Sequence, residues 1–262
     1  MEDLFVIKVG GNVIDDAAFL ASFLSAFAAA PVKKVLIHGG GKIASRLGDK
    51  LGIESNYVNG RRITDGDTID LVTMVYGGLV NKKIVAALQS KGCNAVGLTG
   101  ADADIIPAIK RTVKEIDYGF VGDVQTGKMN PAFLTLLLNN GYSPVIAPLT
   151  HDGKGQMLNT NADTIASSLA IILSNHFHVR LIYCFEKKGV LQDINDEGSV
   201  IRLITKDIYA HLKNEHKLFD GILPKIDNAF AAIDSGVQEV LIGDARDLLT
   251  NITEDTRGTL IK

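Results

Sequence analysis

Cysteine and long stretches of basic residues are scarce in this 262-residue sequence. Its two cysteines, Cys93 and Cys184, match neither a C-x-x-C motif nor a zinc-type spacing, which favours free thiols in a reducing cytoplasm. The formal net charge is −3 and no long basic run occurs, so a surface for nucleic acid or for an anionic membrane is not indicated. These absences leave small-molecule chemistry as the expected function.

Segments that direct a protein to a membrane are also missing from the pattern. No basic and hydrophobic leader precedes Leu4, and no apolar run approaches the roughly 18 residues that a membrane span needs. We therefore expect a soluble protein located in the cytoplasm. Hydrophobic residues, at 46% of the chain, suffice for a large core in one α/β domain of two lobes or in two small domains.

The chain begins with a short apolar run, Leu4 to Val9, which carries Lys8 and breaks at Gly10-Gly11. Such a run bounded by glycine predicts a strand that is buried on both faces of a parallel sheet. The ammonium group of Lys8 would then project from the carboxyl end of the strand, where open α/β sheets bind ligands. The two glycines would let backbone N–H groups approach an anion. A lysine that snorkels beside an ordinary turn is the alternative.

The order of strand, glycine turn and helix recurs along the chain. Residues 34–38 predict a strand, Gly39-Gly40-Gly41 a turn, and the residues up to about Leu51 a helix. This repetition predicts a parallel sheet with right-handed crossovers. Further strands are expected at about 95–98, 144–148, 179–185 and 239–242, an edge strand at 258–261, a hairpin at 57–64, antiparallel excursions at 105–109 and 119–124, and helices at about 16–30, 65–91, 131–140 and 161–175.

The second glycine turn resembles two common nucleotide motifs without matching either. Gly39, Gly41 and Ala44 fit G-x-G-x-x-A, but the acidic residue that a dinucleotide fold places about 20 positions later is replaced here by the basic pair Arg61-Arg62. The spacing of a P-loop is absent as well. We interpret the turn as an anion-binding loop outside both classes.

Six motifs together resemble the N-acetylglutamate kinases of the amino-acid kinase fold, in that family's order and over nearly the whole chain. They are Lys8-x-Gly10-Gly11, His38-Gly39-Gly40-Gly41, Asn59-Gly60-x-Arg62-x-Thr64-Asp65, Gly119-Phe120-Val121-Gly122-x-Val124, Asn159-x-Asn161-Ala162-Asp163 and Gly221-x-x-x-Lys225. The resemblance implies an α/β protein, a three-layer α/β/α sandwich with a mostly parallel central sheet. It also implies one domain over residues 1–262, with a lobe of about 1–175 for acyl-glutamate binding and dimerisation and a lobe of about 176–262 for ATP.

The resemblance implies an activity as well: a phosphotransferase that moves the γ-phosphoryl group of ATP to the side-chain carboxylate of an N-acyl-L-glutamate, in arginine biosynthesis. That carboxylate has a pKa near 4, so it needs no general base, and positioning with charge stabilisation suffices. This agrees with the absence of a His, Cys or Ser constellation for activating a nucleophile. Mg²⁺ would arrive with ATP, since no Asp/Glu cluster suggests a metal held by the protein.

The motifs carry the family's functional residues onto this chain. Lys8 would stabilise the moving phosphoryl group from the acceptor side and Lys225 from the ADP side, with Asp163 between them. Arg62, a fork-shaped partner for a carboxylate, and Asn159 would hold the α-carboxylate end of the substrate. The glycine turns would bind phosphate and lie beside the substrate, through Gly10, Gly11, Gly40 and Gly41.

The sequence departs from the family pattern at two places. Tyr183-Cys184-Phe185-Glu186 stands where the family commonly has a small or hydroxyl residue and then Asp, which leaves the adenine and ribose contacts open. Glu186 either replaces that Asp or is a surface charge. Arg61 stands where leucine is common, and it either is solvated or binds an extra carboxylate such as that of an N-succinyl group. The choice between an acetyl and a succinyl substrate stays open.

The position of Lys8 near the start leaves no room for the amino-terminal helix with which arginine-inhibited members build hexamers. We therefore expect a homodimer that arginine does not inhibit. Two other functions stay open: a related kinase of another acidic amino acid, such as aminoadipate, and a non-catalytic sensor on the same fold. A dinucleotide oxidoreductase is the weakest alternative, because its ribose-binding acid is missing.

Overall fold

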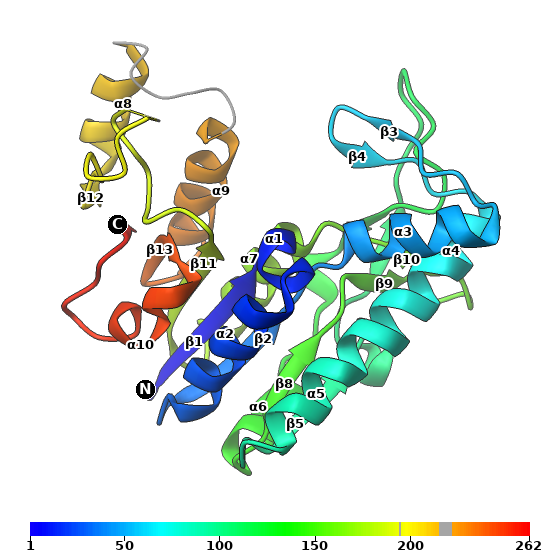
Figure 1. The fold of residues 1–262 in the computed structure, drawn as a ribbon, viewed down its shortest axis with the longest axis horizontal. Helices are drawn as coiled ribbons and strands as arrows, with labels where there is room; N and C mark the ends of the chain where they lie inside the picture. Colours follow the sequence, from blue (N-terminus) through cyan, green and yellow to red (C-terminus); the bar gives the residue numbers. More distant parts are fainter. Residues whose placement is uncertain (194, 215–221) are drawn as a thin grey trace. The chain divides into compact units, whose positions relative to one another are not determined.

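The computed structural model describes residues 1–193, 195–214 and 222–262 (Figure 1). Contacts divide the chain into a first unit of Met1–Val35 and Ala166–Lys262 and a second unit of Leu36–Ile165. The chain passes from one unit to the other within β2 (Lys33–Ile37) and again within α7 (Ala162–Leu173). The first 35 residues thus belong to the same unit as the carboxy-terminal part. The assignment of the acyl-glutamate to a lobe of about 1–175 and of ATP to a lobe of about 176–262 stays a prediction.

The first unit is built on strands in the order β12-β14-β13-β11-β1. β11 is parallel to β1 on one side and to β13 on the other, while β14 is antiparallel to β13. As predicted, β1 is buried from Leu4 to Val9. The strands are β1 (Asp3–Val9), β11 (His178–Phe185), β12 (Leu203–Ile204), β13 (Glu239–Asp244) and β14 (Thr259–Ile261), and the helices are α1 (Gly11–Asp15), α2 (Ala17–Ala29), α8 (Lys206–Asn214), α9 (Leu223–Asp234), α10 (Leu248–Asn251) and a 3₁₀ turn (Ala245–Asp247).

The second unit has three parallel strands in the order β2-β8-β5, and α5 and α6 pack on them (Figure 1). Three short antiparallel pairs, β3 with β4, β6 with β7 and β9 with β10, complete it. The strands are β3 (Tyr57–Val58), β4 (Arg61–Arg62), β5 (Ala95–Leu98), β6 (Ala108–Lys110), β7 (Gly122–Val124), β8 (Ser143–Ile146), β9 (Leu149–His151) and β10 (Met157–Asn159), and the helices are α3 (Gly41–Leu51), α4 (Gly66–Val72), α5 (Asn81–Gln89) and α6 (Ala132–Asn139), with 3₁₀ turns at Asp102–Asp104 and Thr126–Lys128.

The predicted α/β class, a three-layer α/β/α sandwich with a mostly parallel central sheet, is confirmed. Two local features have direct physical causes. Asp16 caps α2 by accepting a hydrogen bond from the Phe19 N–H at 2.9 Å. Asn59 and Gly60 both have positive φ angles, 50° and 72°, as a two-residue hairpin turn requires.

The predicted helix of residues 65–91 contains a segment of another helix type. Between α4 and α5 the residues Thr73–Val80 form a π-helix. The whole helix Gly66–Gln89 is long and apolar enough to cross a membrane, judged by length and composition alone. Its most apolar window is 44% buried inside the structure, and buried core helices of soluble proteins pass the same test, so this is weak evidence.

Candidate active site

Four residues predicted to contact the substrate line one pocket of the second unit, with a volume of about 250 Å³. They are Gly40, Gly41, Arg62 and Asn159, which come from the turn before α3, from α3, from β4 and from β10. The first turn of α7 lines the same pocket through Asn161, Ala162 and Thr164. The sequence motifs therefore converge in space, although up to about 120 positions separate them along the chain.

Arg62 is held rigidly at the wall of this pocket and is only 6% exposed. Its Nη2 donates to the Gly41 carbonyl and to Ser45 Oγ, both at 2.9 Å, and its Nη1 donates to Ser55 Oγ at 2.5 Å. The guanidinium carbon also lies 4.8 Å from the ring centroid of Tyr57. A buried guanidinium that is fixed in this way presents a permanent positive charge to a bound carboxylate.

The glycine turn before α3 is packed tightly against Tyr76 of the π-helix. Gly40 has a φ of 153°, which L side chains rarely adopt, and a Cβ there would lie 3.0 Å from Tyr76 Cδ1. Burial raises the pKa of Tyr76, and Arg62 opposes that shift, so the hydroxyl stays protonated at neutral pH. Because the first N–H groups of α3 have no partner within the helix, the turn can donate hydrogen bonds to an anion.

Asn159, at the end of β10, also lines the pocket. Its Nδ2 donates to Thr64 Oγ1 at 3.0 Å, and its backbone N–H donates to the Phe120 carbonyl at 2.9 Å. The Thr64 carbonyl in turn accepts a hydrogen bond from the Phe120 N–H at 2.6 Å. These contacts join three of the recognised motifs into one hydrogen-bonded network.

His38 supports the glycine turn from beneath and is fully buried. Its Nδ1 lies 2.6 Å from the Gly39 carbonyl, and its Nε2 lies 3.1 Å from the Asn81 amide nitrogen, which also donates to the Val145 carbonyl. This network assigns the proton to Nδ1 and the acceptor role to Nε2, so the ring is neutral. Burial lowers the pKa of His38 to about 4.

The buried, neutral His38 should make folding stability depend on pH. In the unfolded chain the ring takes up a proton below about pH 6.5, whereas the native ring stays neutral until about pH 4, so stability is lost as the pH falls through that window. The loss amounts to about 3 kcal/mol at most. Urea unfolding from pH 7.5 to 4.5 measures it. His38→Gln should flatten the dependence, whereas His178→Gln, at an exposed position, should not; identical slopes for all three proteins would contradict the expectation.

In the first unit, the two predicted catalytic lysines meet at one aromatic ring. Lys8, 8% exposed at the carboxyl end of β1, places its Nζ 5.1 Å from the ring centroid of Phe185. Lys225, in α9, places its Nζ 3.7 Å from the same centroid. The two ammonium groups therefore lie within about 9 Å of each other, inside the range over which charges cooperate in physiological salt.

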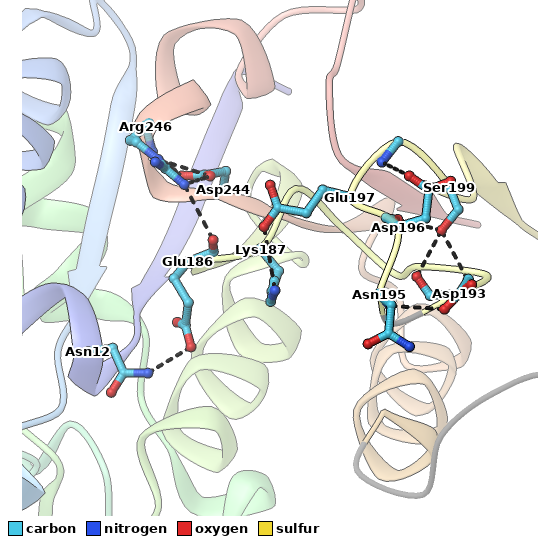
Figure 2. Close-up of polar contacts among 11 residues, drawn as sticks. Asn12, Glu186, Lys187, Asp193, Asn195, Asp196, Glu197, Ser199, Asp244 and Arg246 are labelled. Carbon is cyan, nitrogen blue, oxygen red and sulfur yellow. Dashed lines mark hydrogen bonds and ion pairs between the residues drawn. The ribbon is translucent and has the colours of Figure 1, made fainter.

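Glu186, which follows β11, is hydrogen-bonded to residues that follow the two neighbouring strands, β1 and β13 (Figure 2). Asn12 donates to the Glu186 carboxylate at 2.7 Å, and Arg246 donates to the Glu186 carbonyl at 3.4 Å. Arg246 also makes an ion pair of 2.6 Å with Asp244 at the end of β13. Glu186 is exposed, but its carboxylate is fixed beside the first glycine turn rather than free in solvent. Whether Glu186 replaces the family's Asp stays a prediction.

The other predicted residues lie in the following places. Gly10 donates its N–H to the Cys184 carbonyl at 3.0 Å, and Gly11 begins α1 with nothing within 4 Å of the space where a Cβ would project. Asp163 lies in the first turn of α7, where its N–H donates to Asn161 Oδ1 at 2.8 Å. Gly221 lies outside the described residues. The role of Asp163 between the two lysines stays a prediction.

Sequence reasoning missed several residues that shape these sites. Tyr57, Tyr76 and Arg111 line the pocket, and Phe185 contacts both lysines. None of the four stands in a motif that predicts such a role. Within the described residues, no group of three or more histidine, cysteine, aspartate or glutamate side chains is placed to hold a metal ion.

A comparison with protein-family models decides the family. The model of the amino acid kinase family matches residues 3–244. The chain belongs to that family. The predicted resemblance to an amino-acid kinase is thereby confirmed, and it extends across both compact units.

Relatives within the family are similar over nearly their whole length. An acetylglutamate kinase from Cytophaga hutchinsonii is 55% identical, with 99% of this chain and 98% of that protein covered. One from Phocaeicola vulgatus is 53% identical, with 100% and 99% covered. The solved structure of N-acetylglutamate synthase from Neisseria gonorrhoeae, complexed with coenzyme A and N-acetyl-glutamate, has a TM-score of 0.82 at 22% identity; it covers 99% of this chain and 59% of that one, and it shows the fold alone.

Proposed function

We propose that the protein is an acetylglutamate kinase, which transfers the γ-phosphoryl group of ATP to the side-chain carboxylate of an N-acyl-L-glutamate. The observation that carries this proposal is the identity of 55% to a kinase of that name over 99% of the chain. The reaction forms a bond between a carboxylate oxygen and the γ-phosphorus and breaks the bond to the oxygen that leaves with ADP. The product is an acyl phosphate, and the arginine pathway is where such a product is used.

The substrate end of the reaction is assigned to the pocket of the second unit. Arg62 binds the α-carboxylate of the acyl-glutamate with its fixed guanidinium, and Asn159 holds the same end. Gly40 and Gly41 present backbone N–H groups at the beginning of α3. The side-chain carboxylate is ionised at neutral pH, so the pocket needs to orient it rather than deprotonate it.

The phosphoryl end is assigned to the two lysines and the first glycine turn. Lys8 and Lys225 stabilise negative charge on the transferred group and on the leaving ADP, and the Gly10 and Gly11 turn approaches the phosphate oxygens. Asp163 orients the two ammonium groups. Mg²⁺ bound together with ATP would supply charge neutralisation at the phosphates, while the lysines and the glycine turn hold the phosphoryl group in place.

A coupled assay of ADP release tests the proposed function. The purified protein is mixed with ATP and Mg²⁺ and offered N-acetyl-L-glutamate, N-succinyl-L-glutamate, aminoadipate, glutamate or aspartate. We expect turnover with an acyl-glutamate and at most traces with the free amino acids. Turnover confined to aminoadipate would establish the related kinase instead. Binding of ATP without turnover of any substrate would favour the non-catalytic sensor.

A second cavity gives a specific reason to consider an acyl group longer than acetyl. This cavity, of about 500 Å³, lies beside the hairpin β3-β4 and shares Arg61 and Arg111 with the substrate pocket. Arg111 binds Asp123 through Nε and Nη2, whereas its buried Nη1 has no hydrogen-bond partner among the described residues. Lys114 adds a third basic side chain, and the carboxylates of Glu115 and Asp123 also line the cavity, so that basic side chains exceed acidic ones by one. A terminal carboxylate, such as that of a succinyl group, suits this surrounding.

The role of Arg61 is tested by changing the enzyme and the acyl group together. Arg61→Leu should lower kcat/KM for N-succinyl-L-glutamate about tenfold, as for one lost charge-assisted hydrogen bond, and should change it less than about twofold for N-acetyl-L-glutamate. Arg46→Leu removes the same charge from an exposed position of α3 and is the matched control. Equal losses on both substrates would end the idea that Arg61 contacts the acyl group.

We further infer that the protein acts in the cytoplasm and forms a homodimer that free arginine does not inhibit. Support for self-association comes from Met74 and Leu79, two large apolar side chains that are 58% and 37% exposed on the π-helix. Isolated exposed apolar residues are common on protein surfaces. The support for a dimer is that both residues lie on the same long helix, Gly66–Gln89.

A further inference from the structure

Phe185 stands at a position to which none of the six motifs assigns a function. It is the last residue of β11, and its ring is half-buried between the ammonium groups of Lys8 and Lys225. We propose that Phe185 is a positioning residue, which holds both lysines against one aromatic ring at the separation that phosphoryl transfer requires. This inference rests on the proposed function, because it concerns the two lysines that act in it.

The backbone fixes the position of the ring from both sides. Before it, Cys184 pairs with Val9 of β1 and accepts the Gly10 N–H at 3.0 Å. After it, Glu186 is bound through its carboxylate by Asn12 and through its carbonyl by Arg246, as Figure 2 shows. A side chain between two such anchored neighbours has little freedom to move away from its contacts.

The surrounding side chains fix the orientation of the ring as well. The ring of Tyr183 lies nearly parallel to it, with centroids 6.4 Å apart and an interplanar angle of 19°. A Cβ on Gly10 would lie 3.4 Å from Phe185 Cδ1, so the ring also packs closely on the first glycine turn. The ring thus touches both parts of the predicted phosphoryl site, the glycine turn and the lysines.

The electrostatics explain why a ring suits this position. Two ammonium groups within about 9 Å of each other repel. An aliphatic side chain at position 185 would offer them no electrostatic attraction. The face of an aromatic ring carries partial negative charge, and both distances lie inside the roughly 6 Å over which that charge attracts a cation. The ring attracts the lysines without adding a negative charge of its own, which distinguishes its contribution from that of a carboxylate such as Asp163.

An alternative explanation is that Phe185 only fills space beside β11, and the two explanations differ in what fluorine does. Successive fluorination of the ring withdraws charge from its face while its shape changes little. If Phe185 only packs, kcat should therefore stay constant through the series. If Phe185 positions the lysines, kcat should fall with each added fluorine. Phe5→Leu is the matched control, because Phe5 is a buried aromatic residue of β1 that contacts another cation, Arg180, at 5.7 Å.

The test incorporates phenylalanine with zero to three ring fluorines at position 185 of the full chain and measures kcat, the KM for ATP, the Kd for ADP and the Tm. We expect kcat to fall stepwise, about tenfold in total, with an unchanged Tm, and Phe185→Leu to lose at least as much. Phe5→Leu should keep its kcat. A kcat that stays constant through the series, or that falls only together with the Tm, would overturn the inference.

The failure of this inference is distinguishable from the failure of the proposed function. If the unsubstituted protein releases no ADP with any acyl-glutamate, the proposed function fails. In that case the Kd for ADP still tests whether Phe185 positions Lys225. A Kd that weakens with each fluorine supports the positioning of Lys225 by the ring, and a constant Kd overturns it.

Discussion

Replacing Lys8 with alanine should lower kcat at least about 100-fold while leaving the KM for the acyl-glutamate within a few-fold. The expected size follows from removal of a preorganised charge that acts on the transition state. Lys8 is 8% exposed and lies within about 9 Å of Lys225, so solvent cannot replace its charge. Steady-state kinetics with the acyl-glutamate at saturating ATP and Mg²⁺ measures the effect.

Two further variants separate charge from folding. Lys8→Met keeps an unbranched side chain in the buried position and should lose as much kcat as the alanine variant. Lys33→Ala removes a lysine at the opposite end of a neighbouring strand, where its partner is Glu2 at 3.3 Å, and should keep normal turnover. Near-normal kcat in either Lys8 variant would dismiss Lys8 from the reaction.

Replacing Arg62 with alanine should raise the KM for the acyl-glutamate about 10- to 100-fold, which corresponds to the roughly 1.5–3 kcal/mol of a hydrogen bond to a charged group. Arg62→Lys should give an intermediate value, because a point charge remains and the two-pronged geometry is lost. An unchanged KM would remove Arg62 from the substrate pocket.

The specific partner of Arg62 can be tested by shortening the substrate. An N-acyl-4-aminobutyrate retains the carboxylate that is phosphorylated and lacks the α-carboxylate. If Arg62 binds that missing group, Arg62→Ala should carry little penalty with the shortened substrate. Because Arg62 also donates to Ser55, Ser55→Ala controls for loosening of the arginine itself and should raise the KM only slightly. An equal penalty for Arg62→Ala on both substrates would show that the loss is structural.

The parts of the structure that could be predicted are those that local physical chemistry determines. Buried apolar runs with a glycine break indicated β1 and its lysine, and Asn59-Gly60 indicated a hairpin because both positions need positive φ angles. Arg62 and Asn159 could be predicted as site residues only because their motifs resemble those of a known family. No local sequence pattern indicates that these two distant residues line one pocket.

The parts that escaped prediction depend on contacts between distant segments. Arg111 enters the pocket because β6 pairs with β7, and Phe185 meets Lys225 because β11 and α9 share a unit. The sequence around each of these residues reads as an ordinary strand end. The helix Gly66–Gln89 does not stand out in the sequence as a long apolar segment because Lys82 and Lys83 interrupt it, so that it contains no unbroken apolar run of about 18 residues.

The π-helix of Thr73–Val80 has a consequence for how this site tolerates change. A π turn holds about one more residue than an α turn, so it rotates everything after it around the helix axis. Tyr76, against Gly40, lies inside that segment, and Asn81, which reaches His38, follows directly after it. Deleting one of residues 73–75, ahead of Tyr76, would turn both side chains away from the glycine loop at once. The length of this stretch, as much as its composition, therefore keeps the anion-binding turn in shape.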